Sequence, residues 1–285
     1  MRSSAWIWRL TASVSVAATV VLILGFMYAY DDINDPQGQP LLPGAESEMV
    51  EDIEEGPTGA EDSQSAAALP TDIKVTVIGD SLARGTGDKT GSGFVRRSID
   101  QLHGKEGHTA KLLANLAING LTTEGLLPKL EEKGLQYALQ EANVIMLSIG
   151  GNDLFQGSGL MEGIMDEEGS ELDPAKLMGA LPQASERLQL ILEKLRTINP
   201  NARIIYIGLY HPFADLEDLL IPGNIVVTAW NYAVMEIVSR DPNMTLVPTF
   251  DLFQHKLGEY LSSDHFHPNG DGYQAIADRI VEGML

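Results

Sequence analysis

The sequence predicts a three-layer α/β domain with a mostly parallel five-stranded sheet, preceded by an N-terminal transmembrane helix. Three observations lead to this prediction. Short apolar runs alternate with helical patterns from residue 73 onwards, residues 10–30 carry no charge, and residues 31–72 carry acids but no base. With 285 residues, of which 44 % are hydrophobic, the chain is long enough to bury a sizeable core.

Charge and cysteine content exclude several classes of function. The chain has 40 acidic against 19 basic residues, a net charge of −21. This balance argues against electrostatic binding to nucleic acid or to anionic lipid headgroups. The absence of cysteine removes disulfides, thiolate nucleophiles, zinc–thiolate sites, iron–sulfur clusters and a lipidated N-terminal cysteine.

Residues 10–30, LTASVSVAATVVLILGFMYAY, predict a single-pass membrane anchor. As a helix this run would span roughly 31 Å at about 1.5 Å per residue, close to the bilayer hydrocarbon thickness. Two arginines precede it and three aspartates follow it, so the positive-inside rule leaves residues 1–9 in the cytoplasm and the rest of the chain outside. A cleaved signal peptide, giving a secreted protein, is the alternative.

Residues 31–72 predict a disordered acidic linker. They contain five prolines and 12 acids, and they lack the apolar residues needed to offset the entropy of ordering. A flexible chain of this length reaches roughly 35–40 Å, and repulsion between its charges extends it further. We therefore expect a spacer between the membrane and the domain formed by residues 73–285.

Five apolar runs predict buried parallel strands. They are residues 73–78, 110–113, 144–149, 204–209 and 245–247. Helical spacing of apolar residues predicts helices over 184–198, which Asn199-Pro200 ends, and over 273–284. His255 is also placed on a helix. Because functional groups of such sheets gather at the carboxyl ends of the strands, the residues that follow each strand are the candidates for a site.

Small and polar residues follow the first three strands. Ser81 comes directly after the first, in Gly79-Asp80-Ser81-Leu82, where a nucleophile would be exposed; capping of the next helix is the alternative. Gly120 follows the second strand and can offer a backbone N–H to an oxyanion, or can serve only as a turn. Asn152 follows the third, in Gly150-Gly151-Asn152-Asp153, as an amide donor or as part of an ordinary turn.

The last strand is followed by Asp264-His265-Phe266-His267. A histidine at the mouth of the sheet can take a proton from Ser81, and an aspartate three residues earlier can fix its tautomer. A metal site is the competing interpretation of Asp-His-x-His. It is disfavoured because His103 and His108 fall in a helix-to-strand connection, away from the strand ends.

Together, in chain order, these four blocks resemble those of the SGNH hydrolases, the GDSL esterase/lipase family. The resemblance covers essentially all of residues 73–285; one departure is Ala117, where many members have glycine. It implies a flavodoxin-like fold and acyl transfer to water without cofactor or metal. Ser81 would be the nucleophile, His267 the base and Asp264 its orienting partner. The oxyanion would be held by the N–H groups of Ser81 and Gly120 and the amide of Asn152, while Asp80 and Asp153 would hold loops in place.

The substrate is left open by the sequence. An acyl ester of a lipid or small molecule is the first hypothesis, removal of O-acetyl groups from cell-wall polysaccharide the second, and a silent binding protein on the same fold the third. Residues 155–182 contain apolar residues among glycines and acids, and form either a lid or a helix against the sheet edge. Oligomeric state is not predicted.

Overall fold

The computed structural model describes Thr19, residues 69–155 and residues 174–285. Of the predicted anchor over residues 10–30 only Thr19 is described, and of the predicted linker over 31–72 only residues 69–72, of which Asp72 begins the first strand. The rest of both predictions lies outside the described residues, as does the 156–173 part of the candidate lid. Among the described residues, no helix combines the length and apolar character needed to cross a bilayer. The chain divides into two units, and the domain described below belongs to the second, residues 62–285.

The domain is built on one parallel sheet with the strand order β2-β1-β3-β4-β5. Its strands are β1 (Asp72–Gly79), β2 (Thr109–Asn115), β3 (Val144–Ser148), β4 (Arg203–Ile207) and β5 (Met244–Val247). Each predicted apolar run contributes one strand, which confirms the five-stranded sheet. The order 2-1-3-4-5 is the flavodoxin-like one, and it places a crevice outside the carboxyl ends of β1 and β3, where the strand order reverses.

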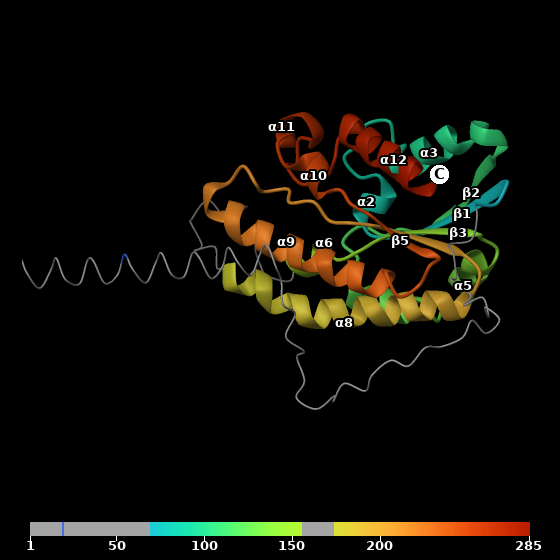
Figure 1. The fold of residues 1–285 in the computed structure, drawn as a ribbon, viewed down its shortest axis with the longest axis horizontal. Coiled ribbons are helices and arrows are strands. Elements are labelled where there is room, and N and C mark those ends of the chain that lie inside the picture. The colour runs from blue at the N-terminus through green and yellow to red at the C-terminus, as the bar shows by residue number, and fades with distance from the viewer. Residues whose placement is uncertain (1–18, 20–68, 156–173) are drawn as a thin grey trace, which may run out of the picture. The chain divides into compact units, whose positions relative to one another are not determined.

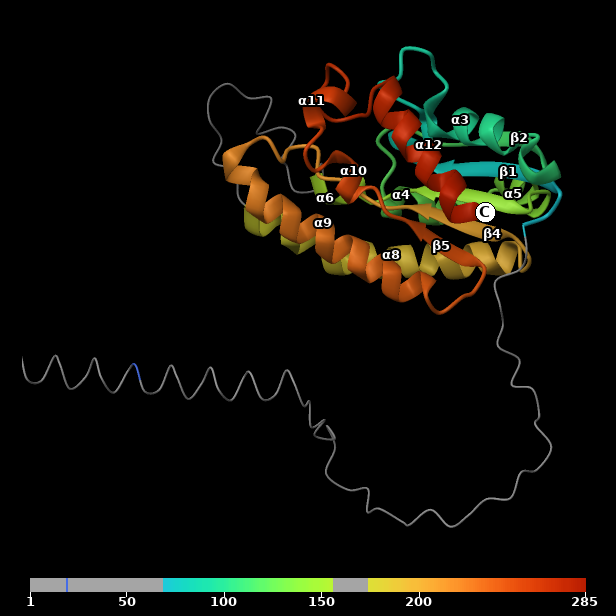
Figure 2. The same cartoon turned by 45° about the horizontal axis from the view of Figure 1, so that its top comes forward.

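Helices cover both faces of the sheet (Figure 1). On one face pack α3 (Gly93–Leu102) and α12 (Gly270–Met284), and on the other α4 (Thr123–Lys129), α5 (Lys133–Gln140), α8 (Pro174–Ile198) and α9 (Glu217–Val238). Side chains of β1 alternate between the two layers: Val75 and Val77 face α3 and α12, while Ile78 faces the α8 side. The turned view shows α8 and α9 side by side (Figure 2).

The predicted helices are present with longer amino-terminal parts. Helix α8 includes residues 184–198 but begins at Pro174, so residues 174–182 of the candidate lid belong to this helix. It ends at Ile198 because the Asn199 side chain bonds the N–H groups of Asn201 and Ala202 instead of continuing the helix. Helix α12 begins at Gly270, where the Asn269 side chain accepts bonds from the first turn.

Short helices complete the domain. They are α2 (Ser81–Arg84), α6 (Gly151–Phe155), α10 (Phe250–Phe253), α11 (Leu257–Tyr260) and a 3-10 turn at Lys105–Gly107. The prediction of His255 on a helix is wrong, since His255 lies in the turn between α10 and α11. The Lys256 N–H bonds the Phe253 carbonyl three residues back, which closes a turn where an α-helix would need a bond to the fourth.

Gly150, at the carboxyl end of β3, allows the chain to approach Trp230 of α9. Its φ is +112°, and a Cβ at this position would lie 2.1 Å from the Trp230 ring. We expect Gly150→Ala to lower the free energy of unfolding by about 2–5 kcal/mol, because it adds overpacking to backbone strain. Gly134→Ala in α5 is the control, since a Cβ there meets nothing within 4 Å. Urea denaturation measures both, and an equal effect of the two substitutions would contradict the close approach.

Candidate active site

Ser81 is held at the start of α2 by the tight connection from β1. Gly79 has φ +128°, and a Cβ there would lie 1.9 Å from the Ser148 carbonyl oxygen, so only glycine fits. The Asp80 side chain then caps α2 by accepting the N–H of Leu82 at 3.1 Å. Ser81 is the first residue of the helix, and the first N–H groups of a helix have no partner within it.

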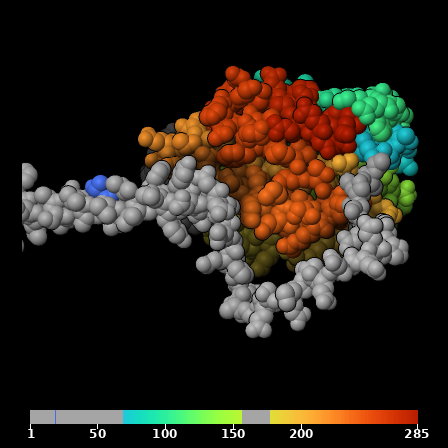
Figure 3. Space-filling model, viewed as in Figure 1, coloured from blue at the N-terminus to red at the C-terminus, as the bar shows by residue number. Residues whose placement is uncertain are grey.

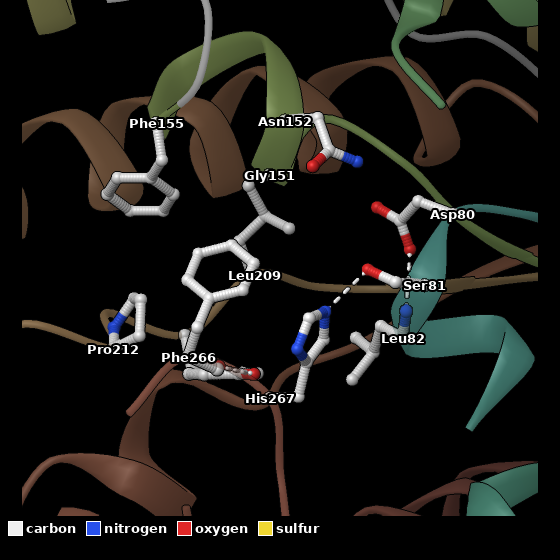
Figure 4. A pocket seen from close by; sticks show the side chains of 11 residues that line it. Asp80, Ser81, Leu82, Gly151, Asn152, Phe155, Leu209, Pro212, Phe266 and His267 are labelled. Carbon is white, nitrogen blue, oxygen red and sulfur yellow. Dashed lines mark hydrogen bonds between the residues drawn. The ribbon is translucent and has the colours of Figure 1, made fainter. Parts of the chain in front are cut away.

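His267 connects Ser81 to Asp264 through one continuous chain of hydrogen bonds. Its Nε2 lies 2.7 Å from the Ser81 hydroxyl oxygen (Figure 4), and its Nδ1 lies 2.7 Å from Asp264 Oδ2. Three residues separated by up to 186 positions in the chain are thereby brought together. An imidazole placed in this way can accept the hydroxyl proton while the carboxylate stabilises the resulting cation.

Asp264 is fixed by its own loop. Its Oδ1 accepts bonds from the Ser262 hydroxyl at 2.7 Å and from the N–H groups of Phe266 at 3.0 Å and His267 at 2.9 Å. Partial burial raises the pKa of Asp264, but the bonds from His267, Ser262 and the backbone outweigh burial and bring the pKa to about 2. Asp264 is therefore a carboxylate at neutral pH, and its second oxygen remains directed at His267.

Asn152 reaches the same place from the carboxyl end of β3. Its buried side chain lines the pocket, and in Figure 4 Asn152 and His267 lie on opposite sides of the Ser81 hydroxyl. The Asn152 amide donates one bond to the Leu121 carbonyl at 2.9 Å, which ties it to the β2–α4 loop. The following Asp153 accepts the N–H and hydroxyl of Thr123 at 2.9 and 2.5 Å.

Gly120 lies in the same β2–α4 loop but is not among the residues that line the pocket. Its φ is +74°, its backbone is exposed, and a Cβ there would meet nothing within 4 Å. The structure thus brings Ser81, His267, Asp264 and Asn152 together and leaves Gly120 on the neighbouring loop.

The pocket beside the Ser81 hydroxyl is small, with a cavity volume of about 30 Å³, and it has mostly apolar walls. Its apolar side chains come from four separate segments, namely Leu82, Phe155, Leu209, Tyr210, Pro212 and Phe266. Phe266 packs edge-on against Phe155, with ring centres 6.1 Å apart, and Tyr210 donates a bond to the Phe266 carbonyl at 2.7 Å. These contacts fix one wall of the pocket next to His267.

Several residues of this site were not identified from the sequence. Ser262 lies in no motif, and although Phe266 stands inside the block 264–267 and Phe155 begins the candidate lid, their places in the pocket wall depend on contacts between distant segments. The only signal for Ser262 is a hydroxyl two residues before an aspartate, a spacing too common to be specific. Tyr210 and Pro212, which follow β4, also line the pocket.

The remaining histidines do not form a metal centre among the described residues, where no group of three potential ligands comes together. His211 is buried, and its Nε2 lies 2.9 Å from the Leu219 carbonyl while its Nδ1 accepts the Phe213 N–H. Burial lowers the pKa of His211, against the opposing effects of Leu219 and Asp215. It is thus a neutral core histidine.

Asp80 is a buried carboxyl directly next to Ser81. Its Oδ1 accepts the Ser148 hydroxyl at 2.9 Å, and its N–H donates to the Ser148 carbonyl at 2.9 Å. Burial raises the pKa of Asp80 to about 7, against the lowering effect of the bonds from Ser148 and the backbone. Asp80 therefore connects β1 to β3, as expected of a residue that holds a loop.

The raised pKa of Asp80 predicts a pH dependence of stability. Between its unfolded pKa of 3.8 and its folded pKa of about 7, the folded state binds the extra proton, so the free energy of unfolding falls as pH rises. We expect Asp80→Asn, which mimics the protonated form, to lose less stability than the wild type from pH 4 to pH 7. Asp251→Asn, which removes an exposed carboxylate, is the control. Urea denaturation measures the free energy of unfolding across this pH range. If this free energy changed with pH equally in the wild type and in Asp80→Asn, the raised pKa of Asp80 would be contradicted.

Comparison with known proteins identifies the family of this chain. Residues 77–275 match the GDSL-like Lipase/Acylhydrolase family. The chain is 31 % identical over 231 residues to YpmR, an uncharacterised protein of Bacillus subtilis, covering 80 % of this chain and 88 % of that protein. It is 28 % identical over 213 residues to the spore germination lipase LipC of Bacillus licheniformis, and the match covers 73 % of this chain and 94 % of LipC.

Solved structures show the same fold. A lipase, Lip_vut3, from a goat rumen metagenome superimposes with a TM-score of 0.64 at 26 % identity, covering 74 % of this chain and 97 % of that one. The family match spans well over half of the chain and includes the blocks around Ser81, Gly120 and Asn152 together with Asp264 and His267. This protein therefore belongs to the GDSL-like lipase/acylhydrolase family and is an ester-hydrolysing enzyme.

Proposed function

We propose that this enzyme hydrolyses acyl esters by a serine mechanism in which Ser81 is the nucleophile, His267 the general base and Asp264 the residue that orients His267. The observation that carries the proposal is the pair of 2.7 Å contacts on either side of the His267 ring. Because Nδ1 faces a carboxylate, it carries the proton, and this leaves Nε2 free to accept the Ser81 proton.

In the first half of the reaction, Ser81 Oγ attacks the ester carbonyl and its proton passes to His267 Nε2. The imidazolium is stabilised by Asp264, whose low pKa keeps it charged. The tetrahedral intermediate then collapses, the alkoxide leaves as the alcohol with the proton from Nε2, and the acyl group stays on Ser81. Water attacks the acyl-enzyme with His267 again as base, which releases the acid and restores the hydroxyl.

The oxyanion of the intermediate would be stabilised by the Ser81 N–H, the Gly120 N–H and the Asn152 amide. Asn152 uses one of its two amide hydrogens on the Leu121 carbonyl, so the second remains for the oxyanion. Ser81 at the first position of α2 supplies an N–H without a helical partner. Gly120 is exposed and comes directly before Leu121, which the Asn152 amide bonds, and this position supports it as a third donor once substrate is bound. One such donor is worth about 10²–10³ in rate.

The pocket walls favour an acyl group with hydrocarbon over a sugar. Leu82, Leu209 and Phe266 offer no hydrogen-bonding side chain to hydroxyl groups. An apolar wall next to the nucleophile stabilises each buried methylene by about 0.8 kcal/mol. We therefore favour acyl esters of lipids or small alcohols over O-acetyl groups of polysaccharide.

A fluorophosphonate probe and a series of p-nitrophenyl esters test the proposal on the full chain in detergent. We expect the probe to label Ser81 in the folded protein and not after heat denaturation, because only the folded site activates the hydroxyl. Activity should rise from acetyl to butyryl or longer esters. Absence of labelling would reject the serine mechanism, and a strict preference for acetyl esters would favour the deacetylase alternative.

We also infer from the sequence that residues 10–30 anchor the enzyme in a membrane and that residues 31–72 tether the domain of residues 73–285 on the extracytoplasmic side. The uncharged run flanked by arginines on one side and aspartates on the other supports this location. The lipid bilayer is then both the support of the enzyme and a source of acyl esters.

A further inference from the structure

Helix α9 carries a stripe of exposed apolar side chains, which we call the α9 stripe. Its members are Leu216, which directly precedes the helix, and Leu220, Ile221, Ile225, Tyr232 and Met235. Twelve large hydrophobic side chains are exposed among the described residues, and six of them lie within these 20 positions, so the stripe is a cluster and not a scatter. Ile221 is 68 % exposed and Ile225 53 % exposed.

The stripe cannot be explained as the core face of the helix. For Ile221, Ile225, Tyr232 and Met235 that face is the opposite one, where Val226, Trp230 and Val234 are buried against the sheet, whereas Leu216 and Leu220 extend the exposed surface around the amino-terminal end of the helix. Residues 219–235 contain no charged residue at all, whereas a solvated surface helix carries charged and polar side chains on its outer face. Contiguous exposed apolar surface of this kind marks a site of interaction.

The stripe is rigidly connected to the candidate active site. Leu209 and Pro212 line the pocket, and the stripe begins only four residues later at Leu216. The Asn231 side chain of α9 accepts the Leu209 N–H at 2.9 Å and donates to its carbonyl at 2.8 Å. The space-filling view shows α9 at the surface of the domain (Figure 3). A surface that contacts the stripe therefore lies next to the segment that forms the pocket wall.

We propose that the α9 stripe rests on an uncharged or zwitterionic lipid surface and thereby brings the pocket to its acyl ester substrate. This inference rests on the proposed function, in particular on the anchor of residues 10–30. A tether of about 40 residues keeps the domain within reach of the bilayer at an effective concentration of about millimolar, so a small apolar contact is sufficient. Tyr232 is a residue type that prefers the bilayer interface.

Charge argues for lipid over a second copy of the chain as the occupant. Residues 73–285 contain 28 acids and 17 bases, which gives each domain a net charge of −11. Two such domains repel each other, and so do the domain and an anionic membrane. A zwitterionic surface is free of this repulsion. Residues 219–235 carry no charge that contact would desolvate, while the acids Glu217, Asp218 and Glu236 lie at the two ends of the stripe.

Single-cysteine labelling tests the contact directly, because the native chain has no cysteine. The full chain carrying Ile225→Cys is labelled with an environment-sensitive dye and reconstituted into phosphatidylcholine vesicles, and flotation establishes whether it is anchored. Tyr137→Cys is the matched control, since Tyr137 is 66 % exposed on α5, which leads into the amino end of β3, away from the pocket. We expect blue-shifted emission and quenching by brominated lipid at position 225 only.

Each other outcome overturns the proposal in a recognisable way. Equal emission at positions 225 and 137 in floating vesicles means that the anchor holds but the stripe does not touch lipid. If the chain does not float, the anchor fails; the same dye is then measured on the free chain with added vesicles, where no shift rejects the stripe as well. A blue shift of the dye at position 225 without lipid means that protein covers the stripe. If the shift grows with protein concentration, a second copy of the chain covers it; if the shift is independent of concentration, another part of the same chain does.

An activity measurement provides a second readout. We expect Ile225→Glu to lower the ratio of lipid-ester hydrolysis in phosphatidylcholine vesicles to soluble-ester hydrolysis by about tenfold, the change that about 1.4 kcal/mol of lost apolar burial produces. Tyr137→Glu should leave this ratio as it is. Equal ratios for the two variants would overturn the assignment of the stripe to the lipid surface.

Discussion

Replacement of Ser81 by alanine is expected to reduce ester hydrolysis by about 10⁵–10⁶-fold, the loss seen when a serine hydrolase loses its nucleophile. The reason is that Ser81 Oγ is the atom 2.7 Å from His267 Nε2, and alanine leaves the base with no proton to take. Steady-state rates on a p-nitrophenyl ester measure the effect, with the remaining rate compared to that of buffer alone.

The matched control for this substitution is Ser92→Ala. Ser92 also lies at the start of a helix, as the residue that precedes α3, but its side chain makes no cap bond there and does not line the pocket. It should keep nearly full activity, and both variants should unfold close to the wild-type temperature. A folded Ser81→Ala enzyme that retains more than about a hundredth of the activity would exclude Ser81 as the nucleophile, because such a small loss is typical of an auxiliary group.

Replacement of Asp264 by asparagine is expected to reduce the same rate by about 10³–10⁴-fold. The asparagine oxygen can keep the bonds from Ser262 and from the backbone N–H groups of Phe266 and His267, so the loop survives. Its amide nitrogen then faces His267 Nδ1 and donates to it. This forces the proton onto Nε2, and the ring can no longer accept the Ser81 proton.

Asp251→Asn distinguishes this effect from loss of a charge or an ion pair. Asp251 lies on α10, outside the pocket lining, and forms an ion pair with Arg279 of α12 at 2.8 Å. The hydrogen bond from Arg279 lowers the pKa of Asp251, as the bonds to Asp264 lower the pKa of that residue. The substitution should change the rate less than twofold. If Asp264→Asn and Asp251→Asn behaved alike, His267 would not depend on Asp264 for its tautomer.

The fold was predictable because its signals are local and repeated. Each strand is a short Val- and Ile-rich run, and helical spacing marks α8 and α12. Where the prediction differs from the structure, tertiary contacts are responsible. Helix α8 begins ten residues earlier than the apolar periodicity indicates, and His255 falls in a turn because Phe253, with no exposed surface, is anchored in the core.

The candidate site was predictable to the extent that it depends on chain order. Ser81 and Asn152 were identified because each follows a buried strand, and parallel strands bring their carboxyl ends to one edge. His267 and Asp264 were identified because three residues separate them in a short loop. Gly120 was identified in the same way; it lies in the β2–α4 loop outside the pocket lining, and its role as an oxyanion donor stays a prediction.

The sequence by itself thus determined the α/β alternation, the family and the residues that carry the proposed chemistry, since these depend on local periodicity and on short motifs. Only the tertiary structure decided which apolar residues line the pocket, how Asp80 is buried against Ser148, and which face of α9 is left uncovered. The physical reason is that burial is a property of what packs against a side chain. In α9 residues 219–235 are uncharged and mostly apolar, so no pattern distinguishes Trp230, which packs against the sheet, from Ile225, which does not.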